Sequence, residues 1–68
     1  MTHRELNELG AELAHMAAAF RAQKTPEDWA ANAALERLAR RLEDAGRELY
    51  EAFPAPPGGW PTPPAGPP

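Results

Sequence analysis

The chain has 68 residues and a net charge of −3, and it contains no cysteine, valine, isoleucine or serine. The absence of cysteine excludes disulfides and thiolate metal sites, and the scarcity of β-branched residues leaves little from which to build a sheet. The mild negative charge argues against nucleic acid as the main partner, because binding to DNA or RNA needs a cationic surface.

The first predicted element is a helix over about residues 2–23. Thr2 and Glu5 have the spacing of a capping box, in which two side chains satisfy free backbone N–H groups of the first turn. Large apolar residues then recur at alternating spacings of three and four, which places them on one face of the helix. This stripe consists of Leu6, Leu9, Leu13, Met16 and Phe20.

A second helix is predicted over about residues 26–53, after a short turn. Thr25 is expected to cap it, and Pro26 is expected at the first helical position, where an N–H group would have no helical partner. Two amphipathic helices joined by a short loop should pack antiparallel. Residues 1–53 are therefore predicted to form an all-α helical hairpin. The leucines of the second stripe are Leu35, Leu38, Leu42 and Leu49.

Residues 54–68 form a separate tail with eight prolines, three glycines and no charged side chain. This composition favours the extended polyproline II conformation. Gly46 lies inside the second helix, where glycine is unfavourable, so we expect it to have a packing role. We predict that the tail folds back over a strip around Gly46, which would bring Trp60 near Ala39; the alternative is that the tail docks on another protein. The residues assigned to tail or partner contacts are Gly46, Tyr50, Phe53, Pro57, Trp60 and Pro61.

A chain of this size buries too little apolar surface to be securely stable alone. Its seven leucines, with Met16 and a few aromatics, give two helices one shared seam and little more. We therefore expect association, either as a homodimer that forms a four-helix bundle or as a subunit of a larger protein complex. The residues assigned to self-association are Leu6, Leu9, Leu13, Met16, Phe20, Leu35, Leu38, Leu42 and Leu49.

One pair of residues is a candidate for metal binding. Glu12 and His15 have the Glu-x-x-His spacing found in ferritin-like di-iron bundles, and a dimer could supply the pair twice. Helical geometry argues against such a site, because both side chains point away from the middle of the apolar stripe. The preferred interpretation is that the protein binds no metal and no other cofactor.

No catalytic arrangement is visible in the sequence. Without serine or cysteine the usual nucleophile–base triads cannot form, and there is no glycine-rich phosphate loop. His3 is expected at the surface. Trp29 is expected to close the hairpin end against Phe20, with an exposed partner anchor as the alternative.

The expected function is that of a non-catalytic protein–protein interaction module, such as an accessory subunit, an adaptor or an inhibitor. The alternatives are a ferritin-like metal-binding bundle and a small nucleic-acid-associated regulator, which would need the arginines of the second helix to converge in a dimer. No apolar run approaches the length of a membrane span, and the N-terminus lacks the apolar segment of a signal peptide. A cytoplasmic location and no membrane partner are therefore expected.

Overall fold

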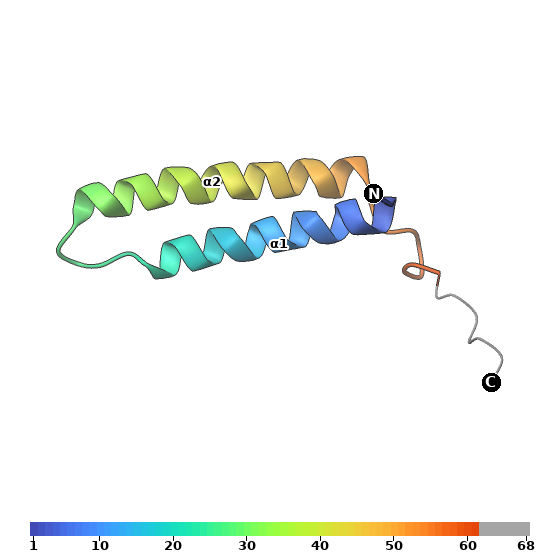
Figure 1. Cartoon of the computed structure of the whole chain (residues 1–68), viewed down its shortest axis with the longest axis horizontal. Coiled ribbons are helices and arrows are strands. Elements are labelled where there is room, and N and C mark those ends of the chain that lie inside the picture. Colours follow the sequence, from blue (N-terminus) through green and yellow to red (C-terminus); the bar gives the residue numbers. More distant parts are fainter. Residues whose placement is uncertain (62–68) are drawn as a thin grey trace, which may run out of the picture.

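The computed structural model describes residues 1–61, which contain the two helices α1 (His3–Ala22) and α2 (Trp29–Ala52). The helices run antiparallel side by side and are joined at one end by residues 23–28 (Figure 1). No strand occurs in residues 1–61, so the prediction of an all-α helical hairpin is confirmed for them. Within the same range, neither helix combines the length and apolar character needed to cross a membrane.

Helix α1 begins where the sequence predicts. The Thr2 hydroxyl accepts a hydrogen bond from the Glu5 backbone N–H at 3.1 Å, and the Glu5 carboxylate accepts one from the Thr2 backbone N–H at 3.2 Å. Both halves of the capping box are therefore present. Because these contacts join residues only three apart, their formation depends little on the rest of the fold.

Helix α2 begins three residues later than predicted, and the prediction that Thr25 caps it is wrong. Asp28 is the cap, and its carboxylate accepts a hydrogen bond from the Ala31 backbone N–H at 3.0 Å. The backbone of Thr25 is instead bound by the side chain of Asn32, which accepts from its N–H at 2.9 Å and donates to its carbonyl oxygen. These two hydrogen bonds hold the loop in a turn before the helix can start.

Small residues, and not leucines, make the closest contact between the helices. A Cβ atom placed on Gly46 would lie 2.7 Å from the carbonyl oxygen of Gly10, and one placed on Gly10 would lie 2.9 Å from that of Gly46. Ala17 and Ala39 lie on the same line of contact and are completely buried. The absence of larger side chains along this line allows the two backbones to touch.

This contact corrects the role predicted for Gly46. The tail was expected to pack there, but α1 occupies the position, and Ala39 is likewise covered. The described part of the tail, residues 54–61, leaves the end of α2 and extends away from the helix pair (Figure 1). Residues 62–68, and any contact predicted for them, lie outside the described residues.

A turn also interrupts the extended conformation expected for the tail. The Gly59 backbone N–H donates to the Pro56 carbonyl oxygen at 2.9 Å, and Gly58 and Gly59 have φ angles of +84° and +90°. Proline at the second position of a four-residue turn and a left-handed glycine at the third are typical of a type II turn. Residues 56–59 therefore bend instead of continuing as polyproline II.

Candidate functional site

The large apolar residues of both helices lie on one side of the seam between Gly10 and Gly46. In each helix they are rotated about 20–120° around the axis from the seam glycine, in the same sense. Helix α2 runs antiparallel to α1 (Figure 1). Rotations in the same sense therefore place both stripes on the same side of the hairpin. We term this surface the apolar face. It consists of Leu6, Leu9, Leu13, Met16, Phe20, Leu35, Leu38, Leu42, Ala45 and Leu49.

The apolar face is open to solvent in the single chain. Met16 is 48% exposed and Leu38 is 43% exposed, while the other residues of the face are half-buried. Among residues 1–61 no large side chain is fully buried. The nine residues that the sequence assigns to self-association thus all lie on this one surface, beside the seam and not inside it. Contiguous exposed apolar surface of this kind marks interaction sites on folded proteins.

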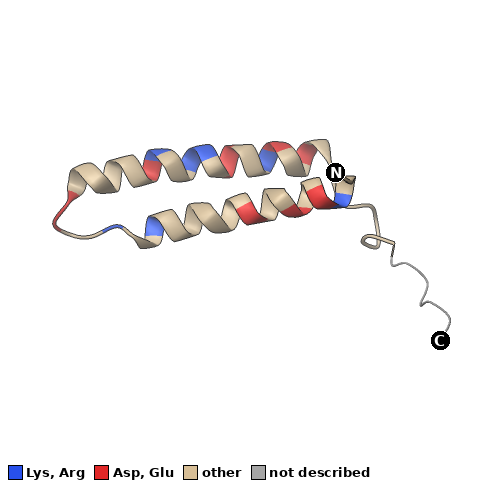
Figure 2. Ribbon diagram, viewed as in Figure 1, with Lys and Arg blue, Asp and Glu red and all other residues tan. Residues whose placement is uncertain are grey.

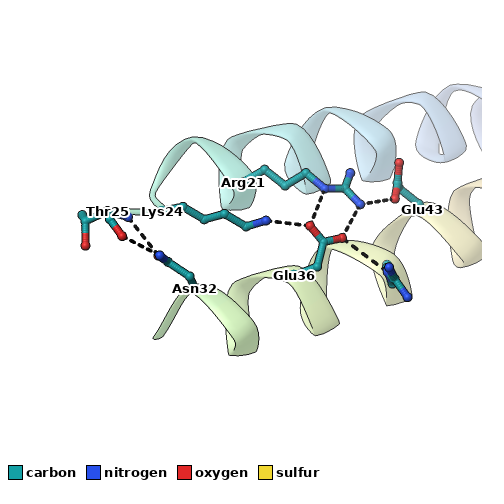
Figure 3. Close-up of polar contacts among 7 residues, drawn as sticks. Arg21, Lys24, Thr25, Asn32, Glu36 and Glu43 are labelled. Atoms are coloured by element: carbon teal, nitrogen blue, oxygen red, sulfur yellow. Dashed lines mark hydrogen bonds and ion pairs between the residues drawn. The ribbon is translucent and has the colours of Figure 1, made fainter. Parts of the chain in front are cut away.

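The opposite side of the seam carries a cluster of ion pairs (Figure 3). The guanidinium of Arg21 in α1 donates to both carboxylate oxygens of Glu36 in α2, at 3.1 Å and 2.8 Å, and also to Glu43. Lys24 adds a bond of 2.7 Å to Glu36, and Arg40 lies 3.4 Å from the same carboxylate. The two-pronged contact between Arg21 and Glu36 has a defined geometry, so it ties α1 to α2 in one alignment.

The ion pairs change the pKa values of both carboxylates. Hydrogen bonds from Arg21 and then Lys24 hold the pKa of Glu36 well below its ordinary value of 4.5, and a hydrogen bond from Arg21 lowers the pKa of Glu43. The hydrogen bonds to Glu36 and, to a smaller extent, to Glu43 raise the pKa of Arg21. All three groups are therefore charged at neutral pH, and none is poised to transfer a proton.

We expect the free energy of unfolding to fall as the pH drops below about 4.5, the ordinary pKa of a glutamate. Because the pKa of Glu36 is lowered in the folded state, the unfolded chain binds a proton first on acidification, and stability is lost as the pH falls further. Glu36→Gln should reduce this acid sensitivity. Urea unfolding followed by circular dichroism between pH 7 and pH 3, at one protein concentration, measures it.

The control for this experiment is Glu51→Gln, which removes an exposed glutamate that forms no ion pair within residues 1–61. It should keep the acid sensitivity of the unsubstituted chain. An equal loss of stability on acidification in the unsubstituted chain and in Glu36→Gln would contradict the role given to Glu36.

Glu12 and His15, the candidate metal ligands, line two different surface hollows. His15 borders a solvent-open hollow of about 280 Å³ together with Ala11, Ala14 and Tyr50, whereas Glu12 borders another one formed by α1 and Met1. In the part of the chain that the structure describes, no three histidine or acidic side chains come together as metal ligands would. A metal at this pair would need its remaining ligands from another chain.

The residues assigned to tail contacts are not gathered at one place. Gly46 lies under α1, Tyr50 lines the hollow beside His15, and the ring of Phe53 packs against His3 with ring centres 5.0 Å apart. The remaining three are in the tail itself, where Trp60 is half-buried and Pro57 and Pro61 are exposed.

Trp29 and Asn7 are placed differently from what the sequence suggests. Trp29 is 80% exposed, so the prediction that it closes the hairpin end against Phe20 is wrong. Asn7 is only 8% exposed, and its side-chain amide donates to the Phe53 carbonyl oxygen at 2.8 Å. The only sequence signal for Asn7 was its position three residues before Gly10, on the face that forms the seam.

At a significant level the chain matches no protein-family model, no curated protein and no solved structure. Its function is therefore inferred from the two sides of the hairpin. One side is apolar and exposed to solvent, and the other carries ion pairs between the helices.

Proposed function

We propose that this protein is a non-catalytic interaction module that binds another protein chain through the apolar face. The observation that supports this most directly is the placement of all the large aliphatic stripe residues on one solvent-exposed side, with Met16 and Leu38 nearly half exposed. Burial of apolar surface is the main driving force of protein association. Covering this face would therefore stabilise the hairpin and the complex together.

The face is also held rigidly enough to bind without large rearrangement. Backbone contact between Gly10 and Gly46 fixes the distance between the helices, and the Arg21–Glu36 pair fixes their alignment. A surface that is ordered before binding loses less conformational entropy on association. These contacts lie in the seam and behind it, so a partner could cover the leucines without disturbing them.

Catalysis is not part of this proposal. The chain has neither a serine nor a cysteine nucleophile, and the charged groups of Arg21, Glu36 and Glu43 are bound to one another. These polar groups join the two helices and are therefore assigned a structural role.

A photo-crosslinking amino acid tests the proposal in cells that produce the chain. A benzophenone side chain in place of Leu38, in the apolar face, should form crosslinks to a protein, which mass spectrometry can identify. The matched control carries the same group in place of Arg47, which lies on the ion-pair side of α2 and is exposed. Crosslinks of equal yield at both positions, or at neither, would contradict an interaction through the apolar face.

A further inference from the structure

We propose that the occupant of the apolar face is a second copy of this chain, with the two α2 helices packed antiparallel about a two-fold axis at Ala45. The inference rests on the proposed function and names the partner of the same surface. Three features support it: the charges along the edge of α2, the order of large and small residues along both helices, and the area of the face.

The charges on α2 are self-complementary. Acidic and basic residues alternate along α2, whereas the middle of α1 carries acidic residues alone (Figure 2). Arg41 and Glu48 border the apolar face about one turn before and one turn after Ala45. Within residues 1–61 neither of them forms an ion pair. A two-fold axis at Ala45 would bring Arg41 of each copy beside Glu48 of the other, so two ion pairs would form.

Side-chain sizes along α2 are complementary about the same axis. Ala45 lies at the axis, where a small side chain lets the two helices approach closely. Leu38 of one copy then lies opposite Ala52 of the other, since they are seven residues to either side of Ala45. Leu42 of one copy lies next to Leu49 of the other, so the α2 contact is apolar on both sides of the axis.

The same axis is also compatible with the residues of α1. Gly10 lies level with Gly46, and the antiparallel arrangement then places position 11 level with Ala45. The same two-fold axis pairs Leu9 of one copy with Leu13 of the other. It also pairs Leu6 with Met16, so apolar residues meet along the middle of the α1 contact. At its outer edge Glu12 of one copy lies near Glu12 of the other, which is one like-charge contact against the two opposite-charge contacts of α2.

The apolar face is large enough for a stable dimer. A helix of 20 residues is about 30 Å long, and two helices side by side are about 20 Å wide. The face therefore covers roughly 600 Å², which falls at the lower end of the area that each partner buries in a specific interface. Two such hairpins stacked face to face form a four-helix bundle.

The other two-fold arrangement, with its axis along the helices, fits the charges less well. It would place α1 of the second copy over α2, with Glu5 and Glu12 of that copy on either side of Glu48. Arg41 would lie near the same Glu12, so each Arg41–Glu12 contact would be outnumbered by two contacts between glutamates. Like charges brought together in this way oppose association and disfavour that orientation. The charge pattern thus selects the arrangement in which α2 meets α2.

Charge exchange tests the arrangement by sedimentation equilibrium over a wide range of concentrations. Arg41→Glu and Glu48→Arg should each raise the dimer dissociation constant at least about tenfold, because each places like charges together at two symmetric positions. An equal mixture of the two variants should recover the original affinity, since the mixed dimer again has opposite charges at both positions. Arg47→Glu, an equal change of charge away from the face, should leave the dissociation constant within about twofold.

The outcomes separate this inference from the proposed function. If the chain stays monomeric while the benzophenone at position 38 crosslinks to a different protein, a second copy is not the occupant of the apolar face. The proposed function as an interaction module would then still stand. If the unsubstituted chain dimerises but the mixture of the two variants does not recover its affinity, the arrangement about Ala45 is wrong. Should either single variant lose its helical circular dichroism, the double variant Arg41→Glu/Glu48→Arg takes its place. The double variant must then dimerise with the affinity of the unsubstituted chain.

Discussion

Gly46→Leu is expected to separate the two helices and to lower the free energy of unfolding by about 3 kcal/mol. Even the first added atom, Cβ, would lie 2.7 Å from the Gly10 carbonyl oxygen. That oxygen belongs to the backbone of a helix, so it cannot rotate out of the way as a flexible side chain would. The helices must move apart, and the contacts of Ala17 and Ala39 along the same line would be lost with them.

Urea unfolding followed by circular dichroism, at one protein concentration, measures this effect. Gly46→Ala should also destabilise, by about 1–2 kcal/mol, because the overlap outweighs the 0.5–1 kcal/mol that alanine contributes to helix stability relative to glycine. The control is Ala19→Leu, which adds a leucine at an exposed position of α1 and should change the stability by less than about 0.5 kcal/mol. A Gly46→Leu chain as stable as the original would show that the seam does not hold the hairpin together.

Asn7→Ala is expected to lower the free energy of unfolding by about 1–3 kcal/mol, because it leaves a helix-end carbonyl group without its hydrogen-bond donor. The side chain of Asn7 is 8% exposed and donates to the Phe53 carbonyl oxygen at 2.8 Å. This bond joins the beginning of α1 to the end of α2, where the last carbonyl groups have no partner within the helix. Its loss should loosen the open end of the hairpin first.

Hydrogen exchange at the last turn of α2, together with urea unfolding, measures the effect of the Asn7 substitution. Asn7→Asp has nearly the same shape but cannot donate once ionised, so it should destabilise at least as much at pH 7. Glu8→Ala, at the exposed neighbouring position, serves as the control and should leave exchange at the end of α2 unchanged. Equal exchange in all three variants would contradict the role of this bond.

The helices themselves could be predicted from the sequence because their signals are local. The capping box at Thr2 and Glu5 involves residues three apart, and alternating spacings of three and four identify each amphipathic stripe. The leucine stripes of both helices lie on one side of the hairpin and not in the seam that the sequence pattern predicts for them. None of these inferences required knowledge of how the helices pack.

The start of α2 could not be predicted in the same way. Both Thr25 and Asp28 are suitable cap residues by type, and local preference alone does not choose between them. The side chain of Asn32, seven residues beyond Thr25, binds the Thr25 backbone and leaves Asp28 as the cap. A contact across that distance depends on the path of the loop, which no periodic pattern encodes.

By itself the sequence determined the number of helices, their antiparallel pairing and the two chemically distinct sides of each one, because these follow from composition and periodicity. Only the tertiary structure decided which side faces the other helix. In each helix the leucine stripe and the glycine–alanine stripe both repeat with the helical period, and the two stripes lie next to each other around the helix axis. The choice depends on whether two backbones can approach closely enough, and contact between Gly10 and Gly46 lets them do so. That contact turns the leucines outward, onto the surface where a partner can bury them.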